Sequence, residues 1–279
     1  MKTNVAARQG LTIDAHGLNA LRLQTTRTPW RLIEAGFGAR DAWAAGHIPG
    51  ADYLDTRELE RLPLWNRIPD AALFAALARH GISADTPVIL YSRNNCAAAR
   101  VAHLFLYAGI ADVQLLDGGW QGWLNAGFDA ATGAPFIPQV QQKSAPLRVN
   151  ARLFTDIHQL RRHLKHNDAT LVSIRSWAEH TGQTSGYDYI EAKGDIPGAR
   201  WGGDYADLIN PDGSWRSAQA ITAMWQRRDI TAQQKVIFYC GTGWRASAAF
   251  MAARAMGWEN ISVYDGGWFE WSSTPQNRP

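Results

Sequence analysis

The stretch that decides the fold is residues 235–247, which read Lys-Val-Ile-Phe-Tyr-Cys-Gly-Thr-Gly-Trp-Arg-Ala-Ser. Its apolar, β-branched and aromatic start predicts a central strand of a parallel sheet over 236–239. A glycine-rich turn follows and opens on Cys240, and we expect a helix over 246–256. Glycines allow successive backbone N–H groups to point into one small bowl, and the helix adds the positive end of its dipole. We therefore expect Cys240 to be a thiolate nucleophile above an anion site.

The chain repeats itself at a fixed offset of 148 residues, from 92 to 240. Three pairs of segments match in this register: 88–92 with 236–240, 48–51 (Ile-Pro-Gly-Ala) with 196–199, and 117–120 (Asp-Gly-Gly-Trp) with 265–268. Three matches without a net gap indicate two copies of one domain. We predict an N-terminal domain over 11–134, a Pro- and Gln-containing linker over 135–149, and a C-terminal domain over 150–279.

Each copy alternates the patterns of strands and helices. In the first copy we expect strands at 30–34, 88–91 and 113–116, and helices at 70–80 and 97–108. In the second copy we expect strands at 171–174, 236–239 and 261–264, and helices at 156–165, after an N-cap at Ser217, and at 246–256. This alternation predicts an α/β fold of two tandem domains, each a parallel sheet flanked by helices. Ligands of such sheets bind beyond the carboxyl ends of the strands, where Cys240 lies.

The composition of the 279 residues, 46% hydrophobic and 19% charged, is that of a folded globular chain. A net charge of +3 without any run of Lys and Arg gives no support to nucleic-acid binding. Two cysteines do not make a disulfide framework, and neither a signal-peptide pattern nor a membrane-spanning apolar run is present. We therefore expect a cytoplasmic protein without nucleic-acid or membrane partners.

The surroundings of Cys240 favour a reactive cysteine over an inert packing one, although most cysteines are structural. A thiolate held by backbone N–H groups can attack a sulfane sulfur and carry it as a persulfide, which divides a transfer into two steps. The anion-binding loop is expected to comprise the five residues after it: Gly241, Thr242, Gly243, Trp244 and Arg245. Arg245 either neutralises an anionic donor or points to solvent as an ordinary first-turn arginine, and we favour the first role.

Phosphatase chemistry is the main competitor, because Cys-(x)5-Arg loops bind phosphate in the same kind of bowl. Here only four residues separate Cys240 from Arg245, and no Asp or His general acid is evident beside the loop. The first copy has Ser92 at the cysteine position, without a GxSxG elbow or an evident base, so we expect this domain to be catalytically silent. Cys96 is interpreted as a packing cysteine, with a second reactive thiol as the alternative.

No metal and no other cofactor is expected. The histidines of the helix expected at 156–165, and one just beyond it, lie mainly on its solvated side, away from the apolar face of Ile157, Leu160 and Leu164; they are His158, His163 and His166. Their spacing does not complete a zinc ligand set.

Taken together, the motifs resemble those of the tandem-domain rhodanese family of sulfurtransferases. The resemblance rests on Cys-Gly-Thr-Gly-Trp-Arg at 240–245, on both Asp-Gly-Gly-Trp signatures and on both Ile-Pro-Gly-Ala turns, and it covers nearly the whole chain. It implies two rhodanese folds, of which the second carries the persulfide-forming cysteine. It also implies a small anionic sulfur donor, thiosulfate or 3-mercaptopyruvate, and as acceptor cyanide, a thiol or a sulfur-acceptor protein.

The loop departs from one branch of that family. Members that prefer thiosulfate usually have cationic side chains after the cysteine, whereas Gly241 and Thr242 are neutral and more similar to the mercaptopyruvate group. The donor therefore stays open. A function of another class also stays open, namely a non-catalytic persulfide relay or docking module for a sulfur-trafficking partner.

The donor-binding arginines depart from the family pattern as well. Family members usually end a strand with Asp-x-Arg and carry a second arginine one turn later, but here these positions are Ser173, Arg175 and Glu179. Asp195 stands where many members have a histidine before Ile-Pro-Gly. The resemblance therefore implies Arg175 and Arg245 as the donor-binding candidates.

Overall fold

The structure is a computed structural model that describes residues 11–24, 30–93, 96–133 and 145–277. The chain divides into two compact units, of which the first comprises Met1–Glu60, Arg67–Ala151 and Pro211–Trp215. The second comprises Arg61–Asn66, Arg152–Asn210 and Arg216–Pro279. Residues 134–144, which include most of the predicted linker over 135–149, lie outside the described residues, so the domain and linker bounds stay predictions.

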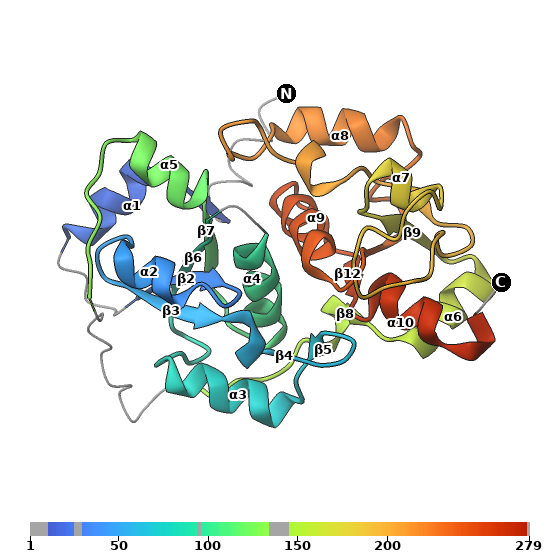
Figure 1. Cartoon of the computed structure of the whole chain (residues 1–279), viewed down its shortest axis with the longest axis horizontal. Coiled ribbons are helices and arrows are strands. Elements are labelled where there is room, and N and C mark those ends of the chain that lie inside the picture. The colour runs from blue at the N-terminus through green and yellow to red at the C-terminus, as the bar shows by residue number, and fades with distance from the viewer. Residues whose placement is uncertain (1–10, 25–29, 94–95, 134–144, 278–279) are drawn as a thin grey trace. The chain divides into compact units, whose positions relative to one another are not determined.

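The first unit is built on a five-stranded parallel sheet. Its strands, in order across the sheet, are β1 (Thr12–Ile13), β7 (Val113–Leu116), β6 (Val88–Tyr91), β2 (Arg31–Gly36) and β3 (Ala51–Asp55). The helices of this half, which lie around the sheet in Figure 1, are α1 (Ala15–Arg22), α2 (Arg40–Ala45), α3 (Asp70–Arg79), α4 (Ala97–Tyr107) and α5 (Gly119–Asn125). A 3-10 turn η1 (Thr56–Glu58) follows β3. Next in the chain comes a two-stranded pair, β4 (Glu60–Arg61) with β5 (Asn66–Arg67), of which Arg61–Asn66 belongs to the second unit.

The second unit repeats this plan. Its parallel sheet has the order β10 (Arg200–Trp201), β9 (Ala169–Ser173), β11 (Lys235–Tyr239), β12 (Ile261–Tyr264) and β8 (Phe154–Thr155). Its helices are α6 (Ile157–His166), α7 (Trp177–His180), α8 (Ala218–Gln226), α9 (Trp244–Ala255) and α10 (Gly267–Ser273). Short 3-10 turns complete it: η2 (Ala151–Leu153), η3 (Tyr205–Asp207) and η4 (Pro275–Asn277).

The side chains of β11 alternate between two helical layers, as the period of a strand requires. Ile237 and Tyr239 join a buried cluster with Leu160 of α6 and Trp271 of α10. Phe238 points the other way and contacts Trp225 of α8, with ring centroids 5.4 Å apart. Because both faces of β11 are covered, the strand is buried from Val236 to Tyr239 and holds the residue that follows it in a fixed place.

The predicted α/β class with parallel, helix-flanked sheets is confirmed. Three central strands, at 88–91, 113–116 and 261–264, have the bounds expected from their apolar runs, and β11 begins one residue early. Ser217 caps α8 as predicted, because its side chain accepts a hydrogen bond from the N–H of Ala220. The edge strands β1, β3, β8 and β10 were missed; three of them have only two residues, too few to show a period.

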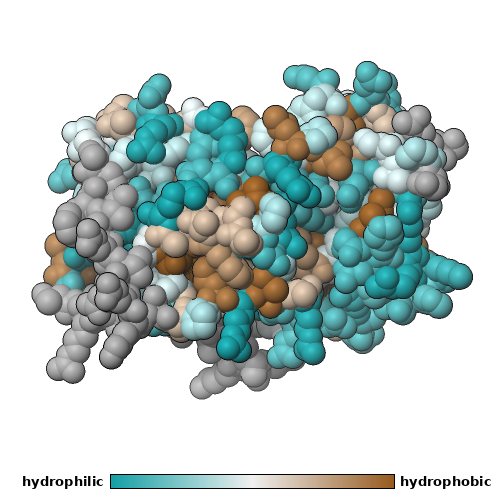
Figure 2. All heavy atoms as spheres, turned by 90° about the horizontal axis from the view of Figure 1, so that it is seen from below, coloured by the Kyte–Doolittle hydropathy of each residue, from teal (hydrophilic) through white to brown (hydrophobic). Residues whose placement is uncertain are grey.

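No helix among the described residues is long and apolar enough to cross a membrane. Figure 2 shows one face of the molecule, on which hydrophilic residues predominate and hydrophobic residues are exposed over a smaller area.

A buried histidine in the first unit links stability to pH. His80, at the end of α3, contacts Asp52 through Nδ1 (2.9 Å) and Glu58 through Nε2 (3.3 Å). Burial alone would lower the pKa of His80, but the two carboxylates raise it to about 9. A group whose folded pKa lies above its unfolded value, about 6.5, stabilises the fold fully below that pH. The contribution is then lost as the pH rises through about 9.

We therefore expect the free energy of unfolding of the wild type to fall by on the order of 2 kcal/mol more than that of His80→Gln between pH 6.5 and about 9.5. Urea denaturation at a series of pH values measures this difference. His158→Gln, an exposed histidine on α6, should follow the wild type. Parallel pH profiles for the wild type and His80→Gln would contradict the prediction.

Candidate active site

Strand β11 delivers Cys240 to the carboxyl edge of the second sheet. The residue is fully buried, and its sulfur lies in the turn that joins β11 to α9. The N–H of Gly243 donates to Cys240 Sγ over 3.2 Å. Gly243 itself adopts a φ of 97°, which ends the turn and lets α9 begin at Trp244, two residues earlier than the sequence predicted. The turn therefore holds the sulfur against one backbone donor, while the anion-binding loop stays a prediction.

The second Asp-Gly-Gly-Trp motif anchors this turn. The N–H of Trp268 donates to the carbonyl oxygen of Cys240 over 2.7 Å, and the N–H of Phe269 donates to that of Gly241 over 3.1 Å. Gly267 has a φ of 57°, and a Cβ on it would lie 2.5 Å from the oxygen of Cys240. Only glycine permits so close an approach, so the motif is explained by its contact with the cysteine loop.

The first unit uses the same anchor for Ser92. The N–H of Trp120 donates to the carbonyl oxygen of Ser92 over 3.0 Å, and a Cβ on Gly119 would lie 2.6 Å from that oxygen. Residues 94–95 of this loop lie outside the described residues. The two units therefore share the scaffold of the loop, and the residue at its start differs.

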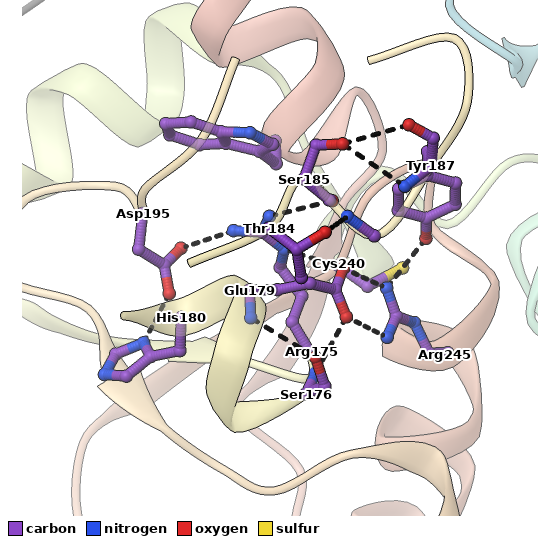
Figure 3. Close-up of polar contacts among 12 residues, drawn as sticks. Arg175, Ser176, Glu179, His180, Thr184, Ser185, Tyr187, Asp195, Cys240 and Arg245 are labelled. Atoms are coloured by element: carbon purple, nitrogen blue, oxygen red, sulfur yellow. Dashed lines mark hydrogen bonds and ion pairs between the residues drawn. The ribbon is translucent and has the colours of Figure 1, made fainter. Parts of the chain in front are cut away.

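Tyr187 lies directly on the cysteine loop. A Cβ on Gly241 would lie 2.2 Å from the ring of Tyr187, and the phenol oxygen accepts a hydrogen bond from Arg245 Nη2 over 2.8 Å (Figure 3). The pKa of Tyr187 is raised above its usual value, mainly by burial and to a smaller extent by the neighbouring Cys240. The phenol is therefore protonated at neutral pH, and its ring covers the loop.

Arg245 points towards α7. Its guanidinium binds Glu179 with both ends, Nη1 to Oε2 and Nη2 to Oε1, each at 2.8 Å, and Nη1 also contacts Asp204 Oδ1 at 3.1 Å. The side chain of Arg245 is only 17% exposed. Burial alone would raise the pKa of Glu179, but the contacts with Arg245 and other groups lower it to about 2. The pair is therefore charged throughout the neutral range.

Arg175 follows β9 and is completely buried. Its Nε lies 3.3 Å from Glu179 Oε1, and its Nη1 donates to the carbonyl oxygen of Gly194 (2.7 Å) and contacts Asp195 Oδ1 (3.3 Å). The guanidinium also lies over the ring of Trp268, 5.1 Å from the centroid. Arg175 thus belongs to the same charged network as Arg245, with Glu179 between them (Figure 3).

The structure brings most of the predicted site residues together. The turn begins at Cys240 and ends at Gly243, with Gly241 and Thr242 buried between them. Trp244 and Arg245 follow at the start of α9, where both are half-buried. The residues that sequence reasoning missed are Tyr187 and Asp204. Both lie between α7 and α8 at positions outside helices and strands, so they gave no periodic signal. Among the described residues, no group of three or more His, Cys, Asp and Glu side chains is placed to hold a metal.

Comparison with known proteins decides the family. A model of the rhodanese-like domain matches residues 24–126 and again residues 156–274. The chain belongs to the rhodanese family. Its two matches agree with the duplication seen in the sequence.

Among relatives of the rhodanese family, thiosulfate sulfurtransferase YnjE of Escherichia coli K12 is 54% identical over 89% of this chain. The sequence of residues 194–275 alone predicts a likeness to YnjE, and the comparison confirms it. The chain spans 59% of the length of YnjE. Sulfur carrier protein TtuD of Thermus thermophilus is 33% identical over 82% of this chain and 83% of TtuD. Human 3-mercaptopyruvate sulfurtransferase is 27% identical over 89% of this chain and 84% of the human protein.

Solved rhodanese structures show the same architecture. The crystal structure of YnjE superimposes with a TM-score of 0.90 at 50% identity, covering 96% of this chain and 67% of that one. The anaerobic ergothioneine biosynthesis enzyme of Chlorobium limicola, solved with trimethyl histidine, superimposes with a TM-score of 0.91 at 35% identity, covering 97% and 70%.

Tyr187 should limit access to Cys240, because its ring lies on the loop and the sulfur is buried beneath the surface. We expect Tyr187→Ala to raise the rate of Cys240 alkylation by iodoacetamide roughly tenfold or more, since a reactive cysteine needs exposure as well as a thiolate. Peptide mass spectrometry distinguishes Cys240 from Cys96. Tyr189→Ala removes a neighbouring exposed ring and should leave the rate within about twofold of the wild type. Equal rates for both variants would show that Tyr187 does not cover the sulfur.

Proposed function

We propose that this rhodanese protein is a sulfurtransferase that carries a sulfane sulfur as a persulfide on Cys240. One observation carries the proposal: Sγ of a buried cysteine at the end of β11 accepts a hydrogen bond from Gly243 in a glycine-rich turn. The names of three relatives, two sulfurtransferases and a sulfur carrier protein, support it. A solved structure of the protein EanB with a persulfide on a cysteine, which superimposes with a TM-score of 0.91 at 35% identity, gives further support.

The first half of the reaction loads the cysteine. The Cys240 thiolate attacks the transferable sulfur of the donor and a new S–S bond forms. The bond that held this sulfur in the donor breaks, and the rest of the donor leaves with the electron pair of that bond. The negative charge moves to the outer sulfur, where the loop of Gly241, Thr242, Gly243, Trp244 and Arg245 stabilises it through backbone N–H groups. The donor is thiosulfate or 3-mercaptopyruvate, held by Arg245 and Arg175.

The second half unloads the cysteine. A nucleophilic acceptor attacks the outer sulfur, the S–S bond breaks, and Cys240 leaves as a thiolate ready for the next donor. Cyanide, a thiol or a sulfur-acceptor protein can fill this role, because each supplies an electron pair to sulfur. A cytoplasmic location, suggested by the small number of cysteines, belongs to the same proposal.

A persulfide relay is the second candidate function. It is favoured by the occupation of both arginines, which already bind carboxylates of the protein itself, and by the name of the relative TtuD. A relay is loaded once by a partner, whereas an enzyme turns over a free donor many times. The number of thiocyanate molecules released per protein, with free donor and cyanide in excess, separates the two functions.

Replacement of the cysteine tests the proposal directly. We expect Cys240→Ser to gain no sulfur when its intact mass is measured after incubation with donor, and to release thiocyanate at least about a thousandfold more slowly than the wild type. Cys96→Ser is the matched control, because Cys96 is the other cysteine of the chain and is also buried. Sulfur transfer that survives in Cys240→Ser would overturn the assignment.

A further inference from the structure

Glu179 uses every acceptor position of its carboxylate within the active site. Oε1 accepts from Arg245 (2.8 Å) and lies 3.3 Å from Nε of Arg175, while Oε2 accepts from Arg245 (2.8 Å) and from the N–H of Ser176 (2.9 Å). The side chain is 4% exposed. A carboxylate of the protein itself therefore already binds both arginines that are the candidates for binding an anionic donor.

Two more carboxylates surround these arginines. Asp204 contacts Arg245 at 3.1 Å. Asp195 contacts Arg175 at 3.3 Å and also binds His180 (Figure 3), and it accepts a hydrogen bond from the hydroxyl of Tyr239. Two guanidinium groups thus face three carboxylates before any donor binds. A donor that brings two further negative charges is repelled here, and one that brings a single charge is repelled less.

We propose that Glu179 is a specificity-determining residue, which makes the site disfavour dianionic donors and prefer 3-mercaptopyruvate to thiosulfate. The inference rests on the sulfur transfer proposed for Cys240. Thiosulfate carries two charges and releases sulfite, which keeps both. 3-Mercaptopyruvate carries one carboxylate and an uncharged thiol. When Cys240 attacks that thiol sulfur, the C–S bond breaks, its electron pair goes to the carbon, and this carbon takes the thiol proton to give pyruvate.

The charge of Glu179 can be removed without losing its shape. Gln in its place keeps one oxygen to accept from Ser176 or Arg245, but it no longer neutralises the arginines. We expect Glu179→Gln to raise kcat/KM for thiosulfate roughly tenfold relative to that for 3-mercaptopyruvate, measured as thiocyanate released with cyanide as acceptor. Glu259→Gln is the matched control. This exposed glutamate precedes β12 and so lies at the amino-terminal ends of the parallel strands, whereas Cys240 lies at their carboxyl ends. It should leave the ratio of the two donors unchanged.

Two results would overturn the inference. One is a donor ratio that Glu179→Gln leaves unchanged, including an equal fall with both donors, which is what a merely structural glutamate would give. The other is a wild type that prefers thiosulfate. If thermal unfolding shows that Glu179→Gln does not fold, Asp204→Asn decides, because it removes a more exposed carboxylate from the same guanidinium and should shift the ratio in the same direction.

Failure of the proposed function gives a different result. A wild type that takes no sulfur from either donor, as judged by intact mass, disproves transfer at Cys240. The charge preference is then read from binding alone. Calorimetry measures the binding of thiosulfate and of pyruvate to Cys240→Ser and to the double variant that also carries Glu179→Gln. We expect the double variant to bind thiosulfate more tightly than Cys240→Ser does. Equal thiosulfate binding would reject the role of Glu179 independently of any chemistry.

Discussion

The hydrogen bond from the Trp268 N–H to the carbonyl oxygen of Cys240 is the contact on which the site depends. It forms only because Gly267, in the left-handed region, lets one backbone lie against the other. With both ends of the turn fixed, one by β11 and the other by α9, the sulfur has little freedom and remains beside the N–H of Gly243. The nucleophile is therefore positioned by backbone geometry, before any side chain of the site contributes.

The charged network around this turn obeys a second constraint. Arg175 is completely buried and Glu179 nearly so, and buried charges are tolerated only when they are paired and hydrogen-bonded. Each of these groups therefore has several partners, and the removal of one partner leaves a charge that the interior cannot solvate. A network under this constraint is rigid, so it can set the electrostatic field at the sulfur, but it offers a donor few unoccupied cationic groups.

The sequence predicted well what is local or periodic. The apolar runs located the central strands, the repeat of Asp-Gly-Gly-Trp revealed two copies, and the glycine pattern placed Cys240 in its turn. The contacts of Tyr187 and Asp204 with Arg245 were out of reach, because they join residues 58 and 41 positions apart, and neither Tyr187 nor Asp204 lies in a helix or strand with a period. The unusual Glu179 was visible in the sequence, but its partner was not, since nothing local indicates that it binds Arg245 66 positions away.

The duplicated chain separates the scaffold from the chemistry. At the offset of 148 residues, Ser92 replaces Cys240 and Ala97 replaces Arg245, so the first copy has neither a thiol at position 92 nor an arginine at position 97. Its own loop arginine, Arg93, sits at another position and binds the buried Glu34 at 2.6 Å. The predicted silence of the first domain thus has two reasons, because a thiol introduced at position 92 would still lack the cation at position 97.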